Sequence, residues 1–179
     1  SRRDWRVLGI RDGFDGLVGE PRWIELDKKA VSGILQRGGT ILGTSNRGNP
    51  FSYPVEQDGK TELRDVSQTV VDNFRKIGAD ALIAVGGDGT LKIARQLGRL
   101  GIPVVGVPKT IDLKGTVFTF GYNTAVGIVT EALDRLHSTA ESHHRVMVVE
   151  VMGRDAGWIA LESGIAGSAD VILIPEIPY

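Results

Sequence analysis

Short apolar runs alternate with amphipathic stretches along the whole chain. The apolar runs predict strands at residues 5–10, 40–43, 81–85, 102–107, 146–151 and 171–174. Apolar positions that recur every three or four residues predict helices at residues 27–37, 63–77, 91–100, 125–136 and 157–166. Residues 44–59 are polar and rich in Asn, Gly and Pro, which predicts a long loop.

Strands that are apolar throughout indicate a sheet buried on both faces. Their alternation with helices predicts an α/β fold, a Rossmann-like parallel sheet with helices on both sides. A length of 179 residues fits one domain with a substantial core. The chain has no internal repeats and no evident linker, so residues 1–179 are treated as one domain.

The overall charge narrows the choice of partners. The net charge of −1 argues against nucleic acid or a membrane held by bulk electrostatics. No apolar run approaches the ~18 residues of a membrane-spanning helix. The chain has no cysteine, which excludes disulfides and thiolate metal sites and fits a cytoplasmic protein. The absence of a signal-like start at Ser1 supports the same expectation.

Two loops follow predicted strands about twenty residues apart. Residues 86–90 read Gly-Gly-Asp-Gly-Thr, and residues 108–112 read Pro-Lys-Thr-Ile-Asp. Because ligands bind at the carboxyl ends of parallel strands, we expect Asp88 and Asp112 on one rim of the sheet. The glycines around Asp88 would let backbone amides approach a phosphate closely.

The two carboxylates suit different tasks. Asp88 suits a magnesium ion on phosphates, although Asp-Gly pairs are also common in ordinary turns. Asp112 suits a general base that takes a proton from a sugar hydroxyl, and a helix or turn cap is an equal alternative. A carboxylate for the metal and a carboxylate base are two groups that phosphoryl transfer uses.

Two cations are candidates for phosphate binding. Lys109 lies in the second loop and could hold phosphate oxygens as a point charge. Arg47 lies in the long polar loop and could stabilise charge on the transferred group. For each, the alternative is a solvated surface side chain.

Two arginines and two histidines flank the predicted strand at residues 146–151. Arg145 precedes this strand and Arg154 follows it, so one strand cannot bring both to one phosphate, and only a second subunit could reconcile them. His143 and His144 are adjacent, and adjacent residues rarely bind one metal together, so we expect them on the surface.

Four stretches together resemble the 6-phosphofructokinase family, in the phosphofructokinase A group. They are residues 86–90, 108–112, 120–125 and 149–154, and the resemblance runs nearly end to end, from Leu8 to Glu176. The Gly-Gly-Asp-Gly-Thr loop alone also resembles the lipid kinases and NAD kinases, which lack the Pro-x-Thr-Ile-Asp and Met-Gly-Arg loops. The resemblance implies the N-terminal domain of a phosphofructokinase.

The resemblance implies roles for individual residues. Asp112 matches the general base that activates the 1-hydroxyl of fructose 6-phosphate, and Arg47 and Lys109 complete the implied catalytic set. The implied donor-binding residues are Arg47, Gly48, Gly87, Asp88, Gly89 and Thr90, with Asp88 near the metal. The implied substrate-binding residues are Thr110, Ile111, Asp112, Arg145, Met152, Gly153 and Arg154.

The implied reaction is transfer of a phosphoryl group from ATP, with Mg²⁺, to fructose 6-phosphate, giving fructose 1,6-bisphosphate in glycolysis. Arg145 matches an arginine that reaches the sugar phosphate in a neighbouring subunit's site. A homodimer or homotetramer with shared active sites is therefore implied.

The sequence departs from the family pattern in three places. The first strand with its glycine-rich loop should precede Ser1, and a second half should follow Tyr179. The family usually has Asn-Asp between the positions of Asp112 and Leu113, so a second carboxylate near the metal is missing. The chain is then a fragment of a longer enzyme, or a truncated, non-catalytic paralogue that binds sugar phosphate or nucleotide.

The choice of phosphoryl donor depends on Gly89 and Lys109. In the family, aspartate at the Gly89 position crowds out the nucleotide and accompanies pyrophosphate use, whereas glycine leaves room for ATP. Lysine at the Lys109 position is typical of pyrophosphate enzymes and also of an ATP-using branch that combines it with this glycine. Because a steric block is harder to evade than a permissive lysine, we expect ATP, with pyrophosphate as the alternative.

Overall fold

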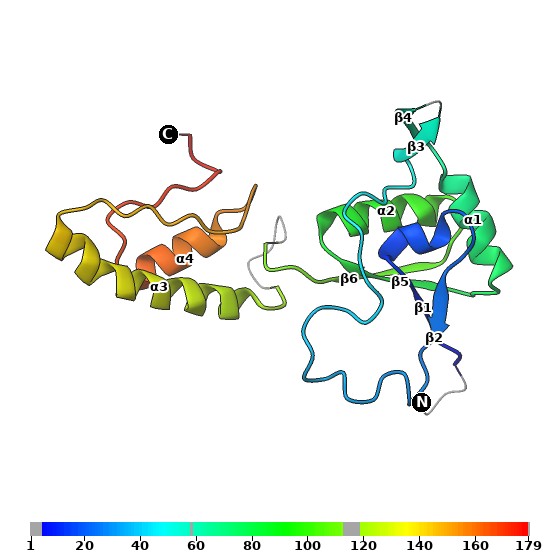
Figure 1. The fold of residues 1–179 in the computed structure, drawn as a ribbon, viewed down its shortest axis with the longest axis horizontal. Helices are drawn as coiled ribbons and strands as arrows, with labels where there is room; N and C mark the ends of the chain where they lie inside the picture. The colour runs from blue at the N-terminus through cyan, green and yellow to red at the C-terminus, as the bar shows by residue number, and fades with distance from the viewer. Residues whose placement is uncertain (1–4, 58, 113–118, 179) are drawn as a thin grey trace. The chain divides into compact units, whose positions relative to one another are not determined.

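A computed structural model describes residues 5–57, 59–112 and 119–178. Figure 1 shows the order of the elements along the chain. The strands are β1 (Leu8–Ile10), β2 (Trp23–Glu25), β3 (Tyr53–Gln57), β4 (Lys60–Arg64), β5 (Leu82–Gly86) and β6 (Val104–Pro108). The helices are the 3-10 helix η1 (Gly13–Leu17) and the α-helices α1 (Ser67–Lys76), α2 (Asp88–Arg99), α3 (Tyr122–His143) and α4 (Trp158–Ala166).

The chain divides into two compact units. Unit 1 comprises Ser1–Ile83 and Ile93–Val105, and unit 2 comprises Ala84–Lys92 and Gly106–Tyr179. The description of residues 1–179 as one domain, the donor-binding N-terminal domain of a phosphofructokinase, stays a prediction. None of the helices in the described ranges is both long and apolar enough to cross a membrane.

The core of unit 1 forms around α1. It consists of buried apolar side chains from η1, α1, α2 and the segment that precedes β6: Leu17, Val70, Val71, Phe74, Leu97 and Ile102. The buried Asn73 amide of α1 donates to the carbonyl oxygens of Leu17, at 2.9 Å, and Gly19, at 2.6 Å. These bonds fix η1 against α1, so the residues that follow β1 have a defined position.

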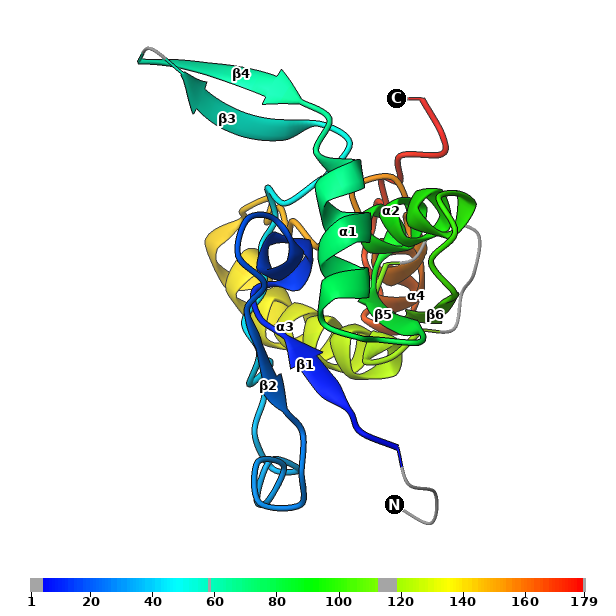
Figure 2. The same ribbon diagram turned by 90° about the vertical axis from the view of Figure 1, so that its right-hand side faces the viewer.

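Two strand pairs in unit 1 are antiparallel. β1 pairs with β2, and β3 pairs with β4 in a hairpin that Figure 2 shows projecting beyond the start of α1. A parallel arrangement was therefore wrong for the strand predicted at residues 5–10, and β3 occupies part of the predicted loop. The predicted helix at residues 63–77 begins later, because Leu63 belongs to β4. Bonds from the hydroxyl and amide of Ser67 hold the pKa of Asp65 below its ordinary value at this helix start.

β5 and β6 form the parallel pair that the sequence predicts. The Leu82 amide donates to the Pro103 carbonyl oxygen and the Lys109 amide donates to the Gly86 carbonyl oxygen, each at 2.8 Å. Residue numbers rise together along both strands, so the strands run in the same direction. The helix α2 connects them, and this strand–helix–strand unit confirms the α/β class.

Two predicted elements of unit 1 do not form. Residues 27–37 make turns, and residues 40–43 form no strand. The apolar side chains of the first segment have no core to cover, since Leu35 is fully exposed and Val31 is 38% exposed. Periodicity alone does not sustain a short helix without such packing.

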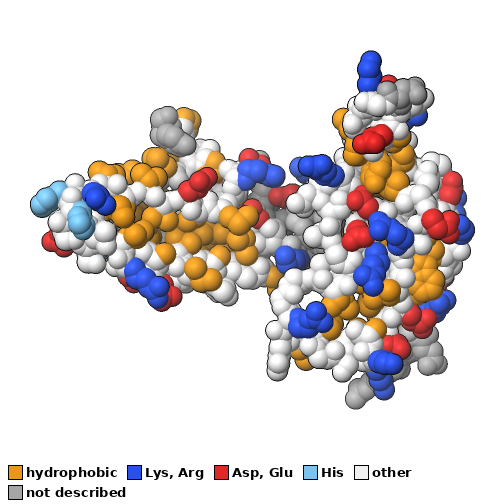
Figure 3. Space-filling model, in the orientation of Figure 1, with side chains coloured by type: hydrophobic (Ala, Val, Ile, Leu, Met, Phe, Trp, Pro, Cys, Tyr) orange, Lys and Arg blue, Asp and Glu red, His pale blue; other side chains and the backbone are white. Residues whose placement is uncertain are grey.

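The predicted strands at residues 146–151 and 171–174 are extended segments without a ladder partner among the described residues. Ile172 and Ile174 lie against Gly164 and Gly157 of the α4 region. The alternate side chains face outward: Val171 is 74% and Leu173 is 57% exposed. On the face displayed in Figure 3, hydrophobic side chains gather over this part of unit 2. The predicted burial on both faces was therefore wrong for these segments, since one side of each is exposed and neither pairs in a ladder.

The helices of unit 2 match their predicted positions, although α3 is longer than predicted. α3 begins after Gly121, whose φ is 84°, and ends before His144, whose φ is 51°. It packs against α4, and the Nε2 atom of His137 lies 2.7 Å from the Gly167 carbonyl oxygen at the end of α4. His143 and His144 are exposed, as expected.

Tyr122 joins the beginnings of α3 and α4. Its side chain is buried, and its hydroxyl donates to the Trp158 carbonyl oxygen at 3.1 Å. Burial, together with a hydrogen bond to Glu162 and the charge of that carboxylate, raises the pKa of Tyr122 to about 12. The folded state therefore favours the neutral phenol more strongly than the unfolded state does.

We predict that Tyr122→Phe lowers the free energy of unfolding of the intact protein by about 1 kcal/mol at neutral pH. The tyrosine's contribution is complete below pH 10 and is lost as the pH rises from 10 towards 12. The difference in stability between the unmodified protein and the variant should therefore shrink over that range. Urea unfolding of both at pH 8 and pH 11 measures it, and a difference that stays constant with pH would contradict the assignment.

Candidate active site

The parallel pair β5–β6 brings the two predicted loops side by side. The Lys109 amide, from the second loop, bonds the Gly86 carbonyl oxygen, from the first. A Cβ atom on Gly87 would lie 3.5 Å from the Cβ of Thr110, an ordinary van der Waals contact. The adjacency expected from parallel strands is confirmed.

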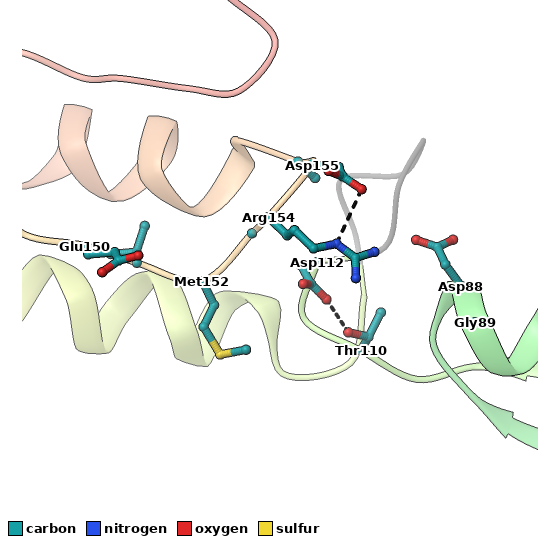
Figure 4. A pocket seen from close by; sticks show the side chains of 11 residues that line it. Asp88, Gly89, Thr110, Asp112, Glu150, Met152, Arg154 and Asp155 are labelled. Atoms are coloured by element: carbon teal, nitrogen blue, oxygen red, sulfur yellow. Dashed lines mark hydrogen bonds and ion pairs between the residues drawn. The ribbon is translucent and has the colours of Figure 1, made fainter. Parts of the chain in front are cut away.

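Residues of both loops line one pocket of about 680 Å³ in unit 2 (Figure 4). Most of the lining was predicted: Asp88, Gly89, Thr110, Asp112, Met152, Gly153 and Arg154. The size lies within the usual range for small-molecule sites. The pocket therefore joins the Gly-Gly-Asp-Gly-Thr loop, the Pro-Lys-Thr-Ile-Asp loop and the Met-Gly-Arg loop.

The first loop runs directly into α2, whose first residue is Asp88. The Leu91 amide is bonded to the Gly87 carbonyl oxygen at 3.0 Å, so the helical hydrogen bonding starts there. The amides of Gly89 and Thr90 precede that point, in the first turn of the helix. Such amides, at the positive end of the helix dipole, suit an anionic phosphate.

Asp112 is held by its own loop. The hydroxyl of Thr110 donates to the carboxylate of Asp112, and Figure 4 shows this bond at the pocket wall. The bond fixes the orientation of the carboxylate and uses one of its oxygens. The lone pairs that remain can take a proton from a hydroxyl placed in the pocket.

Arg154 has an unusual backbone conformation. Its φ is 48°, a region that favours glycine, and the Ala156 amide closes a turn on the Gly153 carbonyl oxygen at 2.9 Å. Its side chain is 80% exposed, and its Nε lies 3.4 Å from an Asp155 carboxylate oxygen. Figure 4 shows the guanidinium extending into the space between Asp112 and Asp88. Strained residues concentrate at functional sites, so this cation is the outstanding candidate for holding a phosphate.

Carboxylates dominate the charge of the pocket. Asp88, Asp112, Glu150 and Asp155 line it, with Arg154 as the one cation among the described lining residues. Phosphate groups entering this pocket would need further positive charge.

The donor set fits a magnesium ion carried by phosphates. Within residues 5–57, 59–112 and 119–178, no three acidic, histidine or cysteine side chains are grouped to hold a metal. Magnesium is usually bound by one or two carboxylates plus substrate phosphates and water, so the Asp88 carboxylate alone suffices on the protein side. The departure from the family pattern after Asp112, where a second carboxylate is missing, falls at Leu113, outside the described residues.

Other predicted residues flank the pocket or lie away from it. Gly87, Thr90, Lys109 and Ile111 belong to its loops without lining it. Arg145 is exposed just beyond α3, where its amide donates to the Ala140 carbonyl oxygen at 2.9 Å, and it does not line the pocket. Arg47 and Gly48 belong to unit 1.

Two charged residues of the lining, Glu150 and Asp155, were not predicted from the sequence. Glu150 carried a usable signal, because it is a charge within an apolar run. The sequence around Asp155 contains no comparable signal, because the ion pair of Asp155 with Arg154 depends on the turn at that arginine.

Two glycines of the first loop differ in the space beside them. A Cβ on Gly86 would lie 2.5 Å from the Thr90 hydroxyl oxygen, whereas no described atom lies within 4 Å of a Cβ on Gly89. We predict that Gly86→Ala destabilises the intact protein by about 1–3 kcal/mol. The matched control Gly89→Ala should stay within about 0.5 kcal/mol. Chemical denaturation of both variants measures this, and equal losses would contradict the packing described.

Comparison with known proteins identifies the family. The phosphofructokinase family model matches residues 1–179. The chain is 61% identical over 178 residues to ATP-dependent 6-phosphofructokinase 2 of Clostridium perfringens (strain 13 / Type A), covering 98% of this chain and 48% of that protein. It is 54% identical over 181 residues to the ATP-dependent 6-phosphofructokinase of Chloroflexus aggregans (strain MD-66 / DSM 9485), covering 100% of this chain and 50% of that protein.

The structure is similar to that of Pichia pastoris phosphofructokinase in the T-state, with a TM-score of 0.80 and 34% identity over 98% of this chain and 19% of that one. The chain spans about half the length of the curated relatives it matches. The loops, the fold and these matches agree, and the chain belongs to the phosphofructokinase family.

Proposed function

We propose that the intact protein transfers the terminal phosphoryl group of ATP to the 1-hydroxyl of fructose 6-phosphate. The observation that carries the proposal is one pocket lined by Asp88 of the phosphate loop, Asp112 as a candidate base and Arg154 as a candidate phosphate ligand. The names of the relatives, which are ATP-dependent 6-phosphofructokinases, support the same reaction. A non-catalytic binding role has no such support.

Asp112 is the proposed general base. Its carboxylate takes the proton of the 1-hydroxyl as that oxygen bonds the γ-phosphorus of ATP. The bond between the γ-phosphorus and the bridging oxygen breaks, and ADP leaves with the electron pair. The products are fructose 1,6-bisphosphate and ADP, and Asp112 later releases the proton to water. The hydrogen bond from Thr110 keeps the carboxylate oriented for this step.

Positive charge is supplied from several loops. Arg154, with Met152 and Gly153, would hold the acceptor, and Thr110 and Ile111 would contact it beside Asp112. Lys109 and Arg47 would hold donor phosphates, and Gly48 and the amides of Gly87, Gly89 and Thr90 would contact the donor as well. A magnesium ion, which Asp88 would help to hold, neutralises phosphate charge when it is bound.

Arg145 is proposed to act in another subunit's site. It lies beyond α3 and does not line the pocket that contains Arg154. An exposed arginine at a helix end is suited to reach across an interface to a sugar phosphate. This arrangement would require a homodimer or homotetramer. A cytoplasmic location also stays a prediction.

We predict that Asp112→Asn in the intact protein lowers kcat about 100-fold or more, the scale of a lost general base, while substrate binding is largely kept. The matched control is Asp80→Asn, which neutralises an exposed carboxylate of unit 1. Steady-state kinetics with ATP, fructose 6-phosphate and magnesium measure both. Near-normal kcat in Asp112→Asn would exclude the base assignment.

We predict that Gly89→Asp shifts the ratio of the two kcat/KM values from ATP towards pyrophosphate. The space beside Gly89 is open, and a carboxylate there would crowd the α-phosphate and repel its charge. Pyrophosphate has no nucleoside, and Lys109 would remain to hold it. Gly98→Asp is the matched control, because it places the same group on the same helix where space is also open. If the unmodified protein prefers pyrophosphate, the donor assignment is wrong.

A further inference from the structure

The loop that carries Arg47 is fixed to unit 1 by its backbone. We call residues 45–52 the arginine loop. Gly48 and Pro50 are buried, whereas Arg47 is exposed. The Val66 amide, at the start of α1, donates to the Pro50 carbonyl oxygen at 2.7 Å. The buried residues that follow Arg47 therefore hold its backbone in place, while its side chain extends from the surface of unit 1.

Asp15 of η1 packs against this loop at Gly48. A Cβ atom on Gly48 would overlap the Oδ1 atom of Asp15 and would lie 2.8 Å from its Cγ. The glycine hydrogen thus faces the carboxylate directly, and no larger residue fits without displacing one of the two. The closeness explains why glycine follows Arg47.

Asp15 also acts on Tyr53, which follows the arginine loop as the first residue of β3. Burial, with the charge and hydrogen bond of Asp15, raises the pKa of Tyr53, which keeps the phenol as a donor. One carboxylate therefore acts on both Gly48 and Tyr53.

This contact is costly for a group with only a packing role. The Oδ1 atom of Asp15 is buried and has no hydrogen-bond partner among the described residues. Buried carboxylate oxygens usually have partners, and an exception requires an explanation. An alanine or leucine in η1 would pack here without that penalty.

We propose that Asp15 is a positioning residue for Arg47, because it packs against the arginine loop at Gly48 and acts on the start of β3 at Tyr53, and so sets the backbone from which Arg47 would bind donor phosphates. The proposal rests on the proposed function, which gives Arg47 its task. It adds a residue of η1 that touches neither substrate and sets the geometry of one that does.

The first test is a double-mutant cycle on the intact protein with Asp15→Ala, Arg47→Ala and the double variant. Asp15→Ala should raise KM for ATP on the order of tenfold, the scale of a misplaced contact. KM for fructose 6-phosphate should stay within about twofold, since Asp112 and Arg154 belong to unit 2. Once Arg47 is alanine, adding Asp15→Ala should raise KM for ATP no further. If Asp15→Ala raises KM for ATP as much in the Arg47→Ala protein as in the unmodified protein, the proposal is wrong.

The second test uses the overlap at Gly48. Gly48→Ala should also raise KM for ATP, and adding Asp15→Ala should not multiply the loss, because removing the carboxylate makes room for the new methyl group. Gly38→Ala is the matched control, a glycine of unit 1 with open space beside it. Asp15→Asn, of the same shape and still an acceptor for Tyr53, should restore most of the donor affinity. If the rise in KM for ATP in the Gly48→Ala, Asp15→Ala double variant equals the product of the two single effects, the proposal is wrong.

Thermal unfolding of each variant separates positioning from folding. A variant with a lowered Tm and equal rises in KM for both substrates would assign Asp15 a purely structural role and overturn the proposal. If Asp15→Ala does not fold, Gly48→Ala and Asp15→Asn decide the question by the same KM comparison. If the unmodified protein does not phosphorylate fructose 6-phosphate with ATP, the proposed function fails separately. The affinity for magnesium-ADP, measured by calorimetry across the same variants, then decides the role of Asp15.

Discussion

The candidate site depends on the parallel pairing of β5 and β6. Two strands that run in the same direction must end at the same edge, and the bond from the Lys109 amide to the Gly86 carbonyl oxygen holds those ends together. A phosphate loop and a base loop that are separate in sequence thereby become neighbours. Everything else at the pocket, including the orientation of Asp112 by Thr110, is arranged around that pairing.

Charge decides what the pocket can bind. Four carboxylates face one guanidinium among its described lining residues, so the protein alone repels the phosphorylated compounds of the proposed reaction. Amides at the start of α2 and cations from neighbouring loops reduce this repulsion. A metal ion arriving with the donor would reduce it most, which fits a site that provides Asp88 rather than a complete metal cage.

The sequence predicted the parts of the fold that depend on the local hydrophobic pattern. The β5–α2–β6 unit, α3, α4 and the sharing of one pocket by Asp88 and Asp112 followed from strand ends and helical periodicity. The helix at residues 27–37 failed because nothing packs on its apolar positions, and residues 146–151 form no ladder because pairing needs a partner that pattern cannot supply. Asp155 and Asp15 were missed for a related reason, since their contacts come from turns and from distant loops.

The left-handed backbone at Arg154 lowers the stability of the folded protein, while the side chain at this position is proposed to bind substrate. Glycine would adopt this φ without the strain of about 1–3 kcal/mol that other residues incur there. It would also remove the one guanidinium of the described pocket lining. Selection for thermostability alone would therefore favour glycine at this position, and selection for substrate affinity would favour arginine. Directed evolution that scores only stability would therefore select against the arginine at this turn.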